Sequence, residues 1–144
     1  MGGASVCYKE AVSGSSMSSE ATTEGIRVSV QARYVEQRSD PARNVYFFAY
    51  AVTIHNVGTA PAKLESRHWV ITDGKGEEQH VKGPGVVGEQ PRLDPDQAFT
   101  YESFCPLETP EGAMRGTYQM VRDDGATFDA EVATFALSAP RLLN

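Results

Sequence analysis

Residues 83–88 have the glycine spacing G-x-G-x-x-G, which in some folds holds a phosphate group. Dinucleotide-binding folds use this spacing where a strand turns into a helix, whose N-terminus then binds the pyrophosphate. Pro91 and Pro95 follow the motif here, and two prolines leave no room for such a helix. No Lys-Ser/Thr pair ends the motif, so a Walker A loop is also excluded. We predict a glycine-shaped loop between two strands.

An alternative for this loop stays open. Consecutive backbone N–H groups can form a nest that binds an anion, and two basic side chains lie close by in the sequence. The candidate binding residues are therefore Lys82, Gly83, Gly85, Gly88 and Arg92. The ligand that this alternative implies is a phosphorylated small molecule, such as pyrophosphate or a dinucleoside polyphosphate.

The three histidines, His55, His68 and His80, are spaced 13 and 12 residues apart. Zinc sites usually contain at least one closely spaced pair of ligands, and this sequence has none. A metal site assembled from three strands is the alternative. We predict three separate histidines, hydrogen-bonded at strand ends, with no metal site and no cofactor.

Catalytic groups are equally sparse. Cys105 could pair with a histidine as a nucleophile, but Pro106 follows it and no helix N-terminus is at hand to lower its pKa. The acidic pairs at 77–78 and 123–124 are typical of solvated turns. We therefore predict no catalytic residues and no enzymatic activity. Two cysteines 98 residues apart form no disulfide framework, so Cys7 and Cys105 are expected to be reduced thiols.

Arg67 and Trp69 are candidate partner-binding residues of a different kind. A strand through this segment places both side chains on one face and His68 on the other. Packing in the core is the ordinary role of a tryptophan in such a strand. An exposed Arg–Trp pair would instead form a recognition surface, because these residue types dominate binding hot spots.

The elements that must position these residues are strands. Residues 26–34 alternate apolar and polar side chains, which predicts a half-buried strand, and residues 45–55 are apolar on both faces, which predicts a central one. Five more strands are expected at 64–72, 77–82, 99–104, 116–121 and 127–137, with a hairpin signal at 73–76 and loops at 83–96 and 106–112. The pattern predicts an all-β fold, an antiparallel two-sheet sandwich of about seven strands, with a small barrel as the competing architecture.

Length and charge bound the remaining possibilities. A chain of 144 residues with a formal charge of −6 predicts one acidic domain, without the basic surface that nucleic acids require. No apolar run is long enough to span a membrane, and no secretory signal is present, so a cytoplasmic location is expected. The small, polar residues 1–25 predict a disordered N-terminal tail, 26–140 the domain, and 141–144 a C-terminal tail. Met17 is a candidate for the natural start of the chain.

Six segments together carry a family resemblance. They are YFFAY (46–50), RHWVITD (67–73), GPGVVGEQP (83–91), YES (101–103), GAMRGTY (112–118) and FAL (135–137). In this combination the sequence resembles the ApaG family over about residues 26–140. The resemblance implies an immunoglobulin or fibronectin type III-like sandwich. It brings no catalytic residues, because none are established for the family.

The resemblance also carries functional expectations. Bacterial members of the family are associated with cobalt tolerance and magnesium efflux, and related eukaryotic domains with protein interaction. The leading expectation is therefore a non-enzymatic module, monomeric or homodimeric, that binds a protein partner through exposed loops and one sheet face. Binding of a phosphate-containing ligand at the glycine loop is the alternative. Neither nucleic acid nor membrane is an expected partner.

Overall fold

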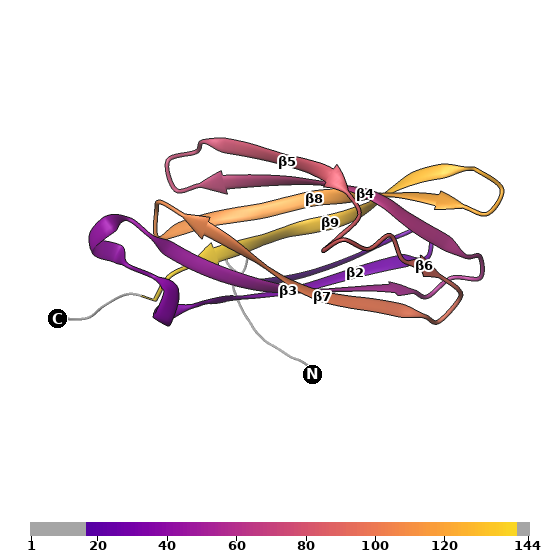
Figure 1. Cartoon of the computed structure of the whole chain (residues 1–144), viewed down its shortest axis with the longest axis horizontal. Helices are drawn as coiled ribbons and strands as arrows, with labels where there is room; N and C mark the ends of the chain where they lie inside the picture. Colours follow the sequence, from indigo (N-terminus) through magenta and orange to yellow (C-terminus); the bar gives the residue numbers. More distant parts are fainter. Residues whose placement is uncertain (1–16, 141–144) are drawn as a thin grey trace.

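The computed structural model describes residues 17–140, which form two antiparallel sheets packed face to face (Figure 1). The first sheet has the order β1-β2-β3-β7, built from β1 (Ser18–Thr23), β2 (Ile26–Tyr34), β3 (Tyr46–Asn56) and β7 (Ala98–Leu107). The second has the order β5-β4-β8-β9, built from β4 (Ala62–Asp73), β5 (Glu78–Pro84), β8 (Glu111–Arg122) and β9 (Thr127–Ser138), with β6 (Arg92–Leu93) also paired to β4. Two short 3-10 turns, η1 (Glu36–Arg38) and η2 (Pro41–Arg43), lie between β2 and β3. The predicted all-β sandwich is confirmed.

The described part of the chain has nine strands rather than about seven, and one of the two additional strands corrects the predicted tail. Residues 18–23 pair with β2 through the turn Glu24-Gly25, in which both residues have positive φ (47° and 85°). Small polar side chains suffice here because the backbone hydrogen bonds to β2 hold the strand, which also packs against β9. The tail boundary at residue 25 was therefore wrong. Residues 1–16 and 141–144, including Cys7, lie outside the described residues.

Two loop predictions also needed correction. The predicted loop at 83–96 contains β6, whose residues Arg92 and Leu93 pair with Lys63 and Ala62 of β4. The predicted loop at 106–112 is shorter, because β7 continues to Leu107 and β8 begins at Glu111. Pro106 lies within β7, and this strand accepts a proline because β7 is at the edge of its sheet, where an N–H is dispensable.

Alternation explains why the sheets close on a common core. Ile26, Val28 and Val30 of β2 are at most 1% exposed, and the intervening residues face outward. Strand β3 lies between β2 and β7 and buries Phe48, Val52 and Ile54, as expected for a central strand. The apolar inner faces of both sheets therefore form one continuous core.

The aromatic side chains of the core correct one prediction. Trp69 is 3% exposed and packs edge-on against Tyr50, Tyr118 and Phe135, with ring centroids 5.4, 6.1 and 6.1 Å away. The hydroxyl groups of Tyr101 and Tyr118 hydrogen-bond to each other inside this cluster. No exposed Arg–Trp pair forms, because the indole lies between the sheets; packing is the role of Trp69.

The two lateral sides of the sandwich differ. On one side β9 packs against β1 and β2, which closes the gap between the sheets. On the other side β5 and β7 are edge strands, and residues 85–97 cross from one to the other through β6 (Figure 1). The glycine-rich loop belongs to this crossing. Among residues 17–140 no helix is long and apolar enough to cross a membrane.

Candidate binding site

The glycine-rich loop is a tight, hydrogen-bonded turn. The backbone N–H of Val86 donates to the carbonyl of Glu89, and the N–H of Glu89 donates back to the carbonyl of Val86, both at 2.8 Å. The two residues between them, Val87 and Gly88, have φ values of 43° and 82°. Positive φ at both central positions is the pattern of a type I′ turn, which favours Asn-Gly. The sequence supplies Val-Gly instead.

Val87 is therefore an unusual residue at the tip of this turn. A β-branched side chain rarely adopts positive φ, because its Cβ substituents crowd the backbone. The side chain is also 58% exposed, the most exposed large apolar group among the described residues. Its neighbour Val86 is fully buried in the core. The turn thus anchors on Val86 and presents Val87 to the solvent.

Arg67 fastens the base of the same turn. Its Nη1 donates to the carbonyl oxygens of Pro84 and Gly85, at 3.0 and 2.8 Å, from the neighbouring strand β4. The N–H of Gly85 donates to the carbonyl of Glu65 on the same strand. The structure therefore brings Arg67 next to Gly83 and Gly85, a contact that the sequence did not predict, and Arg67 supports the turn rather than facing a partner.

The two basic residues predicted beside the loop lie apart. Lys82 stands opposite His68 in the β4–β5 pairing, whereas Arg92 stands opposite Lys63, five residues along β4. Arg92 donates hydrogen bonds of 2.6 Å to both Asp94 and Asp123, and its bond to Asp123 holds the pKa of that carboxyl below its usual range. The N–H groups of residues 85, 86 and 89 bond to backbone carbonyls. This geometry gives the phosphate alternative no convergent site, and that alternative stays a prediction.

The histidines contradict their predicted separation. Nε2 of His68 on β4 lies 2.8 Å from Nδ1 of His80 on β5, and the two rings are tilted against each other with centroids 5.1 Å apart. We call these two residues the histidine pair. His55 is far from them in the fold: it lies on β3 in the other sheet, where its ring contacts Arg27 and Asp96.

Neighbouring side chains surround the histidine pair on the outer face of the second sheet. Nε2 of His80 lies 3.5 Å from Oε1 of Glu78, and Arg115 of β8 lies 3.4 Å from the other oxygen of that carboxylate. Shallow hollows adjoin His68 on two sides, one along Ser66 and Lys82, the other along Arg115 and Thr117. Partial desolvation, with the charges of Lys82, His80 and Arg115, lowers the pKa of His68 below its ordinary value.

Comparison with known proteins now defines the family. The model of the ApaG domain, DUF525, matches residues 36–122. The chain belongs to the ApaG family. Protein ApaG of Anaeromyxobacter dehalogenans strain 2CP-C is 54% identical over 126 residues, which cover 88% of this chain and 99% of that protein. Protein ApaG of Aromatoleum aromaticum is 52% identical over 126 residues, which again cover 88% of this chain and 99% of that protein.

Solved structures agree with the fold of this ApaG domain. A Bordetella pertussis protein solved under the name ApaA superimposes with a TM-score of 0.79 at 47% identity, covering 89% of this chain and 99% of that one. A structural genomics target, SoR45, gives a TM-score of 0.77 at 44% identity, covering 86% and 94%. Both likenesses extend over nearly the whole of each solved chain, so these two proteins share the fold described here.

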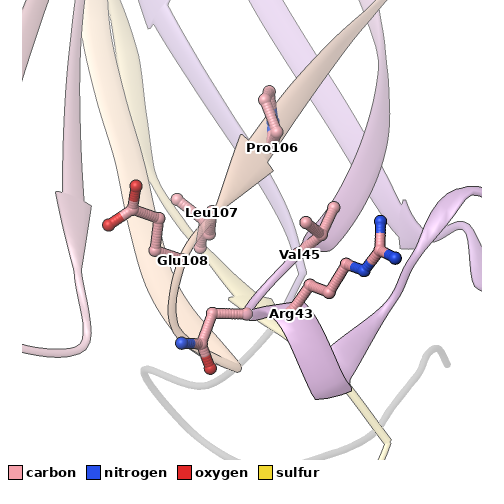
Figure 2. A pocket seen from close by; sticks show the side chains of 6 residues that line it. Arg43, Val45, Pro106, Leu107 and Glu108 are labelled. Atoms are coloured by element: carbon pink, nitrogen blue, oxygen red, sulfur yellow. The ribbon is translucent and has the colours of Figure 1, made fainter.

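A further hollow lies where the start of β3 meets the end of β7 (Figure 2). Arg43 and Val45 line it from one side, and Pro106, Leu107 and Glu108 from the other. Figure 2 shows the charged ends of Arg43 and Glu108 pointing away from one another. Among residues 17–140 no charged side chains converge on this hollow, so we assign it no binding role.

The reactivity of the Cys105 thiol tests the expectation that this residue is not a catalytic nucleophile. The thiol is 3% exposed, and burial raises its pKa to about 11 from an ordinary 9.0. The reactive thiolate is therefore about a hundredfold scarcer than in an exposed cysteine. In a Cys7→Ser background, alkylation by iodoacetamide at pH 8 should be at least about a hundredfold slower in the native domain than in 8 M urea. Rapid native alkylation, unchanged in rate by urea, would contradict this assignment.

Proposed function

We propose that this ApaG domain is a non-enzymatic module that recognises a protein partner through Val87 at the tip of the glycine-rich turn. The observation that carries the proposal is the conformation of Val87: an apolar, β-branched side chain held at positive φ and exposed to solvent. Such local strain persists only where the surroundings impose it, and it concentrates at functional positions. The natural complement is an apolar recess on the partner that encloses the valine.

Three features of the turn support this role. Val86 in the core, Arg67 at the base and the paired hydrogen bonds between residues 86 and 89 hold the tip in one conformation. A preformed tip binds at a lower cost in ordering entropy than a flexible one. Enclosing a valine side chain is worth about 1.5 kcal/mol or more, equivalent to about tenfold in affinity.

Val87→Asn tests the proposal, because it separates stability from binding. Asparagine tolerates positive φ, so this variant should be more stable than the parent. Its free energy of unfolding, measured by urea denaturation, should be about 1 kcal/mol larger. Removal of the apolar tip should nevertheless weaken partner binding by about tenfold. A loss of binding in a more stable protein cannot be explained by unfolding.

The matched control is Val57→Asn. Val57 is another exposed valine, 43% exposed, in the connection between β3 and β4. A partner captured from host lysate would be purified, and its affinity measured for the parent, Val57→Asn and Val87→Asn proteins. We expect the first two affinities to agree. Equal binding by all three proteins would exclude the turn as the contact.

The remaining expectations belong to the same proposal. A cytoplasmic location, and a monomeric or homodimeric state, are consistent with a single acidic domain that carries its own core. The association of the family with cobalt tolerance and magnesium efflux would then arise through the partner. We propose no substrate and no nucleic acid or membrane contact.

A further inference from the structure

The histidine pair is unrelated to the turn that carries the proposed function, and it has a chemistry of its own. We propose that Nε2 of His68 and Nδ1 of His80 together bind a divalent transition-metal ion of the zinc, nickel or copper class. The proposal rests on one juxtaposition: two imidazole nitrogens 2.8 Å apart on neighbouring strands of the same sheet face.

The distance between the two nitrogens suits a chelate. Metal–nitrogen bonds of about 2.0–2.1 Å, at right or tetrahedral angles, place two ligand nitrogens about 2.8–3.4 Å apart. The rings need to separate by at most a few tenths of an ångström and turn their lone pairs toward a common point. His80 is exposed and His68 half-buried, so both rings have room to turn. Imidazole is a preferred ligand of Zn²⁺, Ni²⁺ and Cu²⁺.

Glu78 supplies the outer support that metal-binding histidines usually have. Its Oε1 lies 3.5 Å from Nε2 of His80, the ring nitrogen that points away from His68. A proton held there by the carboxylate leaves Nδ1 of His80 with a free lone pair, which is the form that binds a metal. Arg115 contacts the second oxygen of Glu78 at 3.4 Å and so fixes the carboxylate in place. The carboxylate and both rings therefore form a connected set.

The charges around the pair do not exclude a cation. Lys82 on β5 and Arg115 on β8 are positive, while Glu78 on β5 and Asp129 and Glu131 on β9 are negative. Three carboxylates thus outweigh two cations when both imidazoles are neutral. Among residues 17–140, no group of three or more His, Cys, Asp or Glu side chains could hold a metal. Water must complete the coordination, so binding is weaker than at a structural zinc site and leaves positions open to an outside ligand.

Titration of the full chain with Ni²⁺ tests the proposal. Isothermal calorimetry at pH 7.5, in a Cys7→Ser background, should give one ion per chain. His68→Asn and His80→Asn should each weaken that binding by at least about tenfold, because each removes one of two protein ligands. Glu78→Gln keeps both ligands and should weaken it by about tenfold through the lost support. His55→Asn, on the other sheet, is the matched control and should bind like the parent.

A second readout protects the test against misfolding. Proton–nitrogen correlation spectra of the imidazole rings should show Ni²⁺ broadening the signals of His68 and His80 while those of His55 stay sharp. Unchanged affinity in both His68→Asn and His80→Asn would overturn the proposal, as would the absence of Ni²⁺ and Zn²⁺ binding up to 1 mM. Neither result would bear on Val87, whose test uses a protein partner.

Discussion

Replacing Trp69 by alanine should lower the free energy of unfolding by about 3–5 kcal/mol, the usual loss for a large aromatic side chain in a core. The indole packs edge-on against three aromatic rings, those of Tyr50, Tyr118 and Phe135, which come from both sheets. A cavity at this position therefore loosens the contact between the sheets as well as the packing within one of them.

Urea denaturation followed by far-ultraviolet circular dichroism measures this loss. Fluorescence is unsuitable, because Trp69 is the only tryptophan in the chain. Trp69→Phe serves as the control, since it keeps an aromatic ring in the cluster and should lose clearly less stability than alanine. If Trp69→Ala cost less than 1 kcal/mol, the tryptophan would not be the core residue described here.

The glycines of the turn should differ in their tolerance of alanine, and Gly85 should be the least tolerant. Its φ is 60°, and an added Cβ would lie 2.3 Å from the carbonyl oxygen of Glu89, which is backbone and accepts the bond that closes the turn. Gly85→Ala therefore combines a conformational penalty with a steric clash and should cost about 3 kcal/mol.

Gly88 provides the matched comparison. Its φ is 82°, but a Cβ there would meet no atom within 4 Å. Gly88→Ala should cost only the conformational penalty, about 1 kcal/mol. The free energies of unfolding of the two variants, measured by urea denaturation, should thus differ by about 2 kcal/mol. Equal losses would mean that the contact between Gly85 and Glu89 does not constrain the turn.

The strands were predictable because their patterns are local. Alternation placed one strand at 26–34, which are the bounds of β2, and the two-sided apolar run at 45–55 placed β3 within one residue. Burial of alternate side chains produces this signal directly. Strands β1 and β6 lack it, because β1 is small and polar and β6 has two residues. Their strand character comes from pairing with a neighbour, which composition does not record.

The histidine pair was missed because the sequence does not fix the register of the hairpin that brings the two rings together. The hairpin signal at 73–76 brings β4 and β5 together but does not fix which residues pair; in the structure, paired residues have numbers that sum to 150, as for His68 and Lys82. His80 pairs with Val70, two residues from His68, and is therefore its diagonal neighbour on the same face. The two histidines are 12 residues apart in the sequence, and only the strand register shows that they are neighbours.

The turn at residues 85–89 could not be read in full from the glycine motif. The spacing predicted a glycine-shaped loop, but Val86 and Val87 are identical in type and adjacent, and only the fold sends one into the core and the other into solvent. Likewise, the two carboxylates that accept hydrogen bonds from Arg92 belong to separate turns, and one of them, Asp123, lies 31 residues away in the sequence. Such tertiary partners leave no local trace.

The adjacency of Val86 and Val87 has a mechanical consequence. A single peptide bond joins the residue locked in the core to the residue proposed to meet the partner. No flexible linker lies between the two residues, so a force applied to Val87 acts directly on the core of the sandwich. A partner bound to Val87 would therefore pull on the folded domain itself. Under load, the attachment should yield by rupture at the partner or by unfolding of the sandwich, and not by stretching of a linker.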